Sequence, residues 1–177
     1  MKLGDYLAEL DKVLLVLSRE NIRELEGKSV LLTGASGFIG TWLTQLFSFL
    51  NQHILVKPCR VLCTTHNTET KKYSHTETIK LDLANPIDEK AMEQLPKLDY
   101  IIHTAAIASP KEYNESPIKT LDLSYVGTKN ILEIAKKQGV KSVLCFSSAA
   151  VYGSPSSENI PTKENYVGAI SPFSDRS

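Results

Sequence analysis

A glycine-rich segment between a short apolar run and a helical pattern constrains the fold of this chain most. Residues 29–33 read Ser-Val-Leu-Leu-Thr, a nearly continuous apolar run typical of strands buried on both faces of a parallel sheet. Residues 33–40 read Thr-Gly-Ala-Ser-Gly-Phe-Ile-Gly, and apolar residues at helical spacing follow as far as Leu50. Glycines spaced three apart between a strand and a helix allow a tight turn, a close approach to a phosphate, and close helix packing. The segment therefore predicts an anion-binding turn, where the first N–H groups and the dipole of the helix attract negative charge.

Besides a dinucleotide-type turn, this segment has two other interpretations. A plain turn with incidental glycines is one alternative. A P-loop is excluded because no Gly-Lys followed by Ser or Thr occurs in the segment.

The rest of the chain alternates strands and helices. Further strands are predicted at 60–65, around 78–83, at 100–104 and at 143–147. Asn85-Pro86 and Ser116-Pro117 each supply a capping side chain and a proline at the first helical position, and Gly139 ends the second of these helices. Such alternation needs right-handed crossovers. We therefore expect an α/β fold, a Rossmann-type doubly wound parallel sheet of about five strands with helices on both faces.

Residues 1–28 precede this pattern and are expected to form an extra helix and a linker. Apolar residues recur three or four apart between Leu3 and Leu17, which predicts a helix with one buried face. That face can pack on the core or on a partner. A charged stretch from Arg19 to Lys28 then leads into the domain, which we expect to occupy residues 29–177.

Charge and composition exclude several classes of protein. The 20 Lys+Arg residues balance 20 Asp+Glu residues, and 42% of residues are hydrophobic, which argues against disorder and against a nucleic-acid partner. Cys59, Cys63 and Cys145 are too few and too irregularly spaced for a disulfide framework or a zinc site, so no metal is predicted. The apolar runs are shorter than the roughly 18 residues of a membrane span. Acidic residues interrupt the N-terminal stretch where a signal peptide needs an apolar core. We expect a cytoplasmic protein that uses no membrane.

Four further segments accompany the glycine loop in order along the chain. They are Asp82-Leu83, residues 103–106 (His-Thr-Ala-Ala), residues 127–132 (Gly-Thr-Lys-Asn-Ile-Leu) and residues 147–153 (Ser-Ser-Ala-Ala-Val-Tyr-Gly). Together with the glycine loop, their order and spacing resemble the extended short-chain dehydrogenase/reductases, in particular the NAD(P)-dependent nucleotide-sugar epimerase/dehydratase family. The resemblance implies an NAD(P) cofactor, a nucleotide-sugar substrate and oxidoreductase chemistry.

The resemblance also implies which residues bind the cofactor. The glycine loop would hold the diphosphate, Asp82-Leu83 would contact the adenine, and residues 104–106 would lie beside the adenine ribose. The implied cofactor-binding residues are Gly34, Ser36, Gly37, Phe38, Ile39, Gly40, His66, Asp82, Leu83, Thr104, Ala105, Ala106 and Ser147.

The choice between NAD and NADP depends on the end of the second strand. An acidic side chain there would bind the ribose 2′-OH of NAD, and a cation would suit the 2′-phosphate of NADP. Residues 64–67 read Thr-Thr-His-Asn, which supplies neither an acid nor an arginine. His66, assisted by Lys71 or Lys72, would favour NADP; alternatively it is a solvated loop histidine. NAD is favoured because the epimerase-like relatives usually hold it tightly.

The catalytic residues implied by the resemblance are only partly found. Ser148 corresponds to the family's Ser or Thr that hydrogen-bonds the reacting oxygen; a serine that satisfies its own loop is the alternative. The family's tyrosine, with a lysine four residues later, should lie on the next helix, and no such pair occurs there before Ser177. We therefore expect an N-terminal portion, truncated before the catalytic helix and substrate lobe and incomplete as a catalyst. A homodimer through the 116–138 helix is one way to cover the surface this would leave exposed.

One departure from the family pattern narrows the reaction that the resemblance implies, and another bears on how active the protein is expected to be. Ala149 and Ala150 stand where the 4,6-dehydratases of the family carry Asp and Glu, which favours epimerisation or ketone reduction. Ser124 stands where relatives commonly carry Asn, which weakens the expected activity. The competing hypothesis is a non-catalytic module that binds a dinucleotide or a protein partner.

Overall fold

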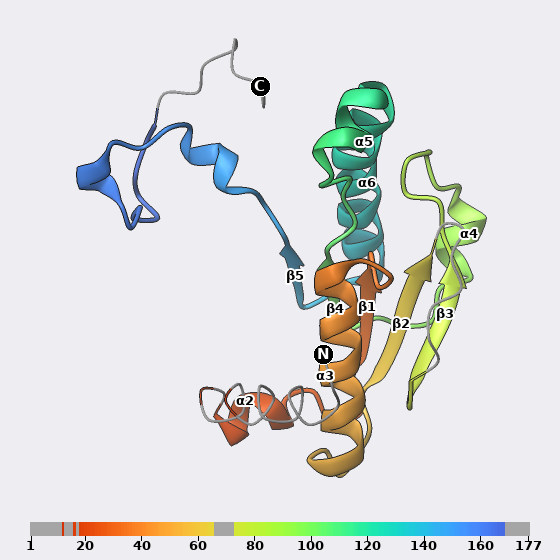
Figure 1. Ribbon diagram of the computed structural model, residues 1–177. Helices are drawn as coiled ribbons and strands as arrows, with labels where there is room; N and C mark the ends of the chain where they lie inside the picture. Colours follow the sequence, from red (N-terminus) through yellow and green to blue (C-terminus); the bar gives the residue numbers. More distant parts are fainter. Residues whose placement is uncertain (1–11, 13–15, 17, 66–72, 169–177) are drawn as a thin grey trace. The chain divides into compact units, whose positions relative to one another are not determined.

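A parallel sheet forms the centre of the molecule. The computed structural model describes residues 12, 16, 18–65 and 73–168. Its strands are β1 (Ser29–Thr33), β2 (Arg60–Thr65), β3 (Thr76–Lys80), β4 (Tyr100–His103) and β5 (Ser142–Cys145), in the order β3-β2-β1-β4-β5 (Figure 1). Neighbouring strands pair in parallel throughout. The strand order reverses between β1 and β4, and this switch point is where doubly wound sheets bind ligands at the carboxyl ends of their strands. The predicted α/β class and five-stranded sheet are confirmed.

Helices lie on both faces of the sheet. The longest are α3 (Phe38–His53) and α6 (Pro117–Gln138), which cover opposite faces (Figure 1). Shorter elements are α2 (Arg19–Arg23), α4 (Glu89–Glu93), α5 (Pro110–Glu115) and the 3₁₀ turns η1 (Ala149–Tyr152) and η2 (Ser157–Asn159). Gly139 ends α6 in the left-handed conformation with φ 63°, as its sequence predicts. None of the helices in the described ranges combines the length and the apolar character needed to cross a bilayer.

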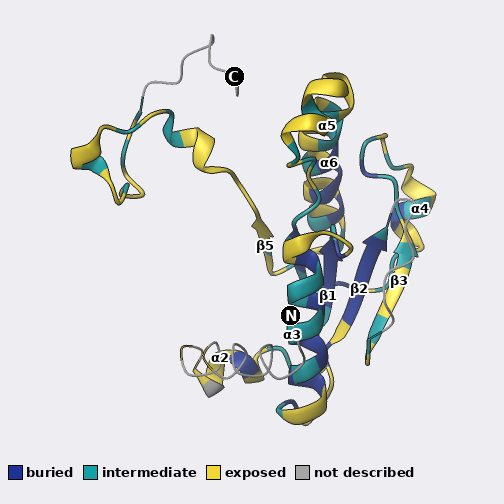
Figure 2. Cartoon of the chain, viewed as in Figure 1, coloured by how far each residue is buried: buried dark blue, intermediate teal, exposed yellow. Residues whose placement is uncertain are grey.

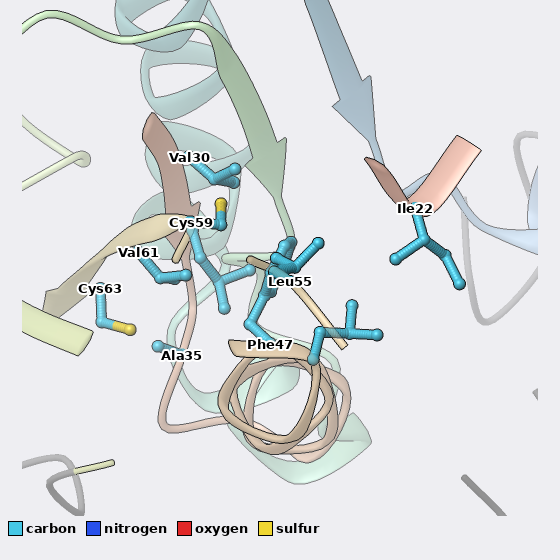
Figure 3. Packing of buried hydrophobic residues seen from close by; sticks show 10 residues of the cluster. Ile22, Val30, Ala35, Phe47, Leu55, Cys59, Val61 and Cys63 are labelled. Carbon is cyan, nitrogen blue, oxygen red and sulfur yellow. The ribbon is translucent and has the colours of Figure 1, made fainter. Parts of the chain in front are cut away.

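Two apolar clusters show how β1 serves both faces. Val30 and Leu32 belong to the cluster that contains Phe47 of α3, part of which Figure 3 shows, whereas Leu31 belongs to the cluster that contains Ile131 of α6. Side chains of a strand alternate between faces, so a strand covered on both sides is apolar at successive positions. Val30, Leu31 and Leu32 are fully buried for this reason. The central strands are dark blue in Figure 2.

The edge strand β3 has a different character from the centre. Its sequence is Thr-Glu-Thr-Ile-Lys, and three of its five residues are exposed (Figure 2). Arg60 Nε and Nη2 donate hydrogen bonds of 2.7 Å to the two carboxylate oxygens of Glu77. The edge strand is therefore polar and mostly exposed, whereas Val61, Leu62 and Cys63 of the neighbouring strand β2 are buried.

The N-terminal segment is described only in part. Of the helix predicted between Leu3 and Leu17, only Lys12 and Val16 lie among the described residues, and both are helical. The stretch predicted as a linker contains α2. Ser18 Oγ accepts a hydrogen bond from the Asn21 amide at the start of α2, and Ile22 is buried with the residues around Phe47. The capping serine and the buried isoleucine both contribute to the order of this charged turn.

Two other boundaries differ from the sequence-based expectation. The helix predicted to begin at Asn85-Pro86 begins instead at Glu89, because Asp88 Oδ1 accepts a hydrogen bond of 2.6 Å from the Ala91 amide. The third strand ends at Lys80, so Asp82 and Leu83 lie in the following loop rather than in the strand. A further helix, α5, directly precedes α6 and was not predicted.

The chain divides into two compact units. Residues 1–145 form the unit that contains the sheet, and residues 146–177 form the second unit, which contains η1 and η2.

Candidate functional site

The first glycine of the loop, Gly34, packs closely against Thr104 and Ala105, the residues that follow β4. Gly34 has φ +68°, and a Cβ atom there would lie 2.8 Å from the Ala105 amide nitrogen and 2.8 Å from Thr104 Oγ1. Neither the backbone conformation nor the space admits a side chain. The loop therefore leaves β1 as bare backbone at the switch point of the sheet.

The third glycine brings α3 against the same turn. A Cβ atom on Gly40 would collide with Gly34 O and would lie 2.7 Å from Ala35 Cα. Gly37, the N-cap of α3, has no side chain that could accept a hydrogen bond from the first N–H groups of this 16-residue helix. These groups and the positive end of the helix dipole therefore face the turn uncapped, which suits an anion such as a diphosphate.

A buried histidine connects the turn to α6. His103 Nδ1 lies 2.7 Å from Thr33 Oγ1, and His103 Nε2 lies 3.5 Å from Thr128 Oγ1. The Thr33 hydroxyl accepts hydrogen bonds from the amides of Thr104 and Ala105, at 3.2 and 3.3 Å, so its own proton is available to Nδ1. The Thr128 hydroxyl donates to Ser124 O at 2.7 Å and can accept from Nε2.

The partners of the two ring nitrogens fit a neutral imidazole. We assign the tautomer in which Nδ1 accepts from Thr33 and Nε2–H is directed at Thr128, because the Thr33 hydroxyl proton is available to Nδ1. Desolvation lowers the pKa of His103 from its usual value of 6.5. A neutral His103 thus holds the ends of β1 and β4 together beneath the glycine turn.

A cavity of about 940 Å³ opens at this end of the sheet. Ligand pockets of 300–1,000 Å³ are typical of small molecules and cofactors. Eight residues singled out from the sequence line it together, although they come from three separate segments. They are Gly34, Ser36, Gly37, Asp82, Leu83, Thr104, Ala105 and Ala106.

The remaining residues singled out from the sequence lie elsewhere. Gly40 shapes the turn from behind without lining the cavity, and the side chains of Phe38 and Ile39 are exposed, Phe38 by 90%. His66 lies outside the described residues. Ser147 and Ser148 belong to the second unit, where Ser148 Oγ accepts a hydrogen bond of 3.2 Å from the Ala150 amide and caps η1.

The loop after β3 forms another wall of the cavity. Asp82 Oδ1 accepts a hydrogen bond from the Ala84 amide at 3.0 Å, and Asp82 Oδ2 accepts one from Asn85 Nδ2 at 2.8 Å. Asn130 of α6 donates through Nδ2 to Leu83 O and Asn85 O, at 3.0 and 2.8 Å. Side-chain hydrogen bonds therefore fix the shape of this wall.

Sequence reasoning missed the part of the lining that comes from α5 and the start of α6. Glu112 and Glu115 lie on α5, and Lys119 and Asp122 lie on α6. Ser109-Pro110 is the same start signal as Ser116-Pro117 and would have revealed α5. Among the described lining residues the charged ones are four acids and a single lysine. Phosphate charge would therefore be met by the amides at the start of α3 rather than by cations.

The described residues hold no group of three or more His, Cys, Asp or Glu side chains placed to bind a metal ion. Cys59 and Cys63 are buried, and desolvation, reinforced by Asp99, raises the pKa of the Cys59 thiol to about 12. Such a thiol stays protonated at neutral pH and does not act as a thiolate ligand.

Comparison with known proteins identifies the family of this chain. The model of the NAD dependent epimerase/dehydratase family matches residues 30–175. UDP-glucuronic acid decarboxylase 1 of Danio rerio is 32% identical over 156 residues, covering 88% of this chain and 35% of that protein. UDP-glucuronic acid decarboxylase 4 of Arabidopsis thaliana is 31% identical over 170 residues, covering 94% of this chain and 34% of that protein. The chain spans about a third of the length of these curated relatives.

Solved structures show the same fold. Epimerase Mth375 of Methanothermobacter thermautotrophicus matches with a TM-score of 0.67 and 27% identity, over 86% of this chain and 44% of that one. The UDP-glucose 4-epimerase of Bifidobacterium longum, in complex with NAD+ and UDP, matches with a TM-score of 0.60 and 25% identity, over 80% of this chain and 43% of that one. With a family match over residues 30–175 and curated relatives above 30% identity, this chain belongs to the NAD dependent epimerase/dehydratase family.

Proposed function

We propose that this chain forms the cofactor-binding part of an oxidoreductase that acts on a nucleotide sugar, with NAD as the preferred cofactor. The observation that carries the proposal is the turn at Gly34, where two strand ends and a helix start leave room for backbone alone. Backbone packed this closely keeps side chains out of the turn, and the uncapped N–H groups at the start of α3, at the switch point of a parallel sheet, suit a diphosphate.

In this proposal, each segment around the cavity binds a different part of the cofactor or substrate. The amides at the start of α3 bind the diphosphate, and the Asp82–Asn85 loop lies on the adenosine side because it neighbours the end of β2. Residues 104–106 form the opposite wall beside Gly34. When bound, the nicotinamide group supplies hydride transfer, and Ser148 would hydrogen-bond the reacting oxygen of the sugar.

The reaction type is proposed within the family. The curated relatives carry the name UDP-glucuronic acid decarboxylase, and the solved relatives include epimerases, one of them with UDP bound. Both activities begin with a sugar attached to a nucleoside diphosphate. Ala149 and Ala150 cannot act as an acid and a base. They therefore favour epimerisation or ketone reduction, which need no such groups at those two positions.

Two features support proposals about the surroundings of the protein. The described cysteines are free thiols, which suits a reducing compartment such as the cytoplasm. Leu121, Tyr125 and Leu132 of α6 are more than half exposed, which supports a homodimer through this helix.

Calorimetric titration of the chain with NAD and with NADP, in separate experiments, tests the cofactor proposal. We expect one molecule of NAD bound per chain, and weaker binding of NADP. The Gly34→Ala variant, whose Cβ would meet the Thr104–Ala105 peptide, should lose the binding heat while circular dichroism confirms a folded chain. A wild-type chain that gives no heat and no thermal shift with either dinucleotide would contradict the proposal.

A further inference from the structure

One polar side chain of α6 reaches the cavity wall from the far side of the fold. Asn130 lies on α6 and is only 3% exposed. It contacts the loop after β3, at Leu83 and Asn85, which precede it by 47 and 45 residues in the sequence. Both of its amide hydrogens are used, one on Leu83 O at 3.0 Å and one on Asn85 O at 2.8 Å. Asn130 does not itself line the cavity, so any effect on a ligand must pass through this loop.

The loop that Asn130 holds is not part of a strand or a helix. It follows β3 at Lys80 and precedes α4 at Glu89, so no sheet ladder fixes its carbonyl groups. Within the loop, Asp82 accepts hydrogen bonds from Ala84 and Asn85 and sets the local turn. Asn130 supplies the external attachment, which places that turn at a definite position against α6.

The position in the sheet of β3, the strand that the loop follows, indicates which half of a dinucleotide the loop contacts. β3 neighbours β2, and in doubly wound sheets the end of the second strand meets the ribose of the adenosine half while the diphosphate lies over the glycine turn. We infer that Asn130 is a positioning residue for the adenosine half of the dinucleotide, acting through the carbonyls of Leu83 and Asn85. This inference rests on the proposed function.

The chemistry of the amide group explains why asparagine is required. Aspartate has the same shape, but its carboxylate carries no hydrogen and its protonated form carries only one, so an Asn130→Asp variant cannot donate to both carbonyl oxygens. At least one of the two carbonyls would lose its donor, and the attachment of the loop to α6 would weaken. The apolar contacts of α6 with the sheet would be retained, since Asn130 is not part of them.

The experiment compares Asn130→Asp with Ile134→Val in the 177-residue chain. Ile134 is fully buried one turn further along α6, so its variant measures loss of stability without loss of the loop attachment. Affinities for NAD and for ADP-ribose are measured calorimetrically well below the unfolding temperature. We expect Asn130→Asp to weaken both ligands about 10-fold and by equal factors, because both contain the adenosine half. Ile134→Val should bind both ligands as the wild-type chain does.

A measurement on the wild-type chain covers the case in which Asn130→Asp does not fold. The side-chain amide signals of Asn130 are followed by NMR during titration with ADP-ribose, and we expect them to shift although Asn130 is outside the cavity. Unchanged Asn130 signals, or equal affinity in a folded Asn130→Asp variant, would overturn the inference. A wild-type chain that binds neither NAD, NADP nor ADP-ribose would instead overturn the proposed function.

Discussion

The two walls of the cavity are built on opposite principles. At the glycine turn, Gly34 and Gly40 allow backbone segments to approach so closely that an added methyl group has no space. At the loop after β3, the side chains of Asp82 and Asn130 hold the backbone through hydrogen bonds. The first wall is therefore sensitive to atoms that are added, and the second to donors and acceptors that are removed.

The largest effect is expected from adding one methyl group to the glycine wall. In Gly40→Ala the new Cβ would meet the backbone of Gly34 and Ala35, which cannot move without displacing α3. We expect a loss of about 3 kcal/mol in the free energy of unfolding, measured by urea denaturation, together with loss of dinucleotide binding.

Gly127→Ala is the matched control for this prediction. A Cβ on Gly127 would make ordinary contacts of 3.5 Å with Leu83 O and Leu123 Cδ1, and the residue lies within α6. The same substitution there should raise the free energy of unfolding by about 0.5–1 kcal/mol through helix propensity. Equal destabilisation by both variants would show that steric exclusion does not distinguish the glycine wall.

A smaller effect is expected from removing a hydroxyl group at the base of the glycine wall. Thr33→Val keeps the shape of a fully buried side chain but leaves the amides of Thr104 and Ala105 and the Nδ1 of His103 without their partner. We expect a loss of about 2 kcal/mol in thermal or urea unfolding. Thr33→Ser keeps the hydroxyl and should recover more than half of this loss. If serine and valine behave alike, the methyl group and not the hydroxyl is what matters at this position.

The smallest effect is a dependence of stability on pH. Burial lowers the pKa of His103 below 6.5, so the unfolded chain takes up a proton first as the pH falls. The stabilising contribution is complete above about pH 6.5 and is lost as the pH falls towards the lowered pKa, with a slope of at most about 1.4 kcal/mol per pH unit. The His103→Asn variant keeps an acceptor for Thr33 and does not titrate. Urea unfolding between pH 7 and pH 5 should therefore show a shallower decline in the variant than in the wild-type chain, and parallel curves would contradict the assignment of a neutral His103.

The central part of the fold could be predicted from the sequence because its signals are local and redundant. The apolar run at 29–33 and the strand at 60–65 have the predicted boundaries, since a strand buried on both faces cannot include polar side chains without cost. The glycine turn follows the first of these strands as the spacing of Gly34, Gly37 and Gly40 predicts. The roles assigned to the residues of the site remain predictions.

The parts that could not be predicted depend on contacts between distant residues. Asn85-Pro86 has the signature of a helix start, yet Asn130, 45 residues later, holds the carbonyl of Asn85 in a loop. The helix begins after Asp88 instead, because the Asp88 carboxylate accepts a hydrogen bond from the Ala91 amide and caps the helix. The network of Thr33, His103 and Thr128 likewise joins positions that no periodic pattern relates.

The bidentate pairing of Arg60 with Glu77 has a consequence for how the sheet ends. A sheet can be extended by any extended peptide that satisfies the open N–H and C=O groups of its outermost strand. A peptide approaching β3 would have to displace water from Glu77, Arg60 and Lys80 without offering them new partners. Recruitment of foreign strands, the first step of fibril growth, is thus opposed at β3 by its exposed charged side chains.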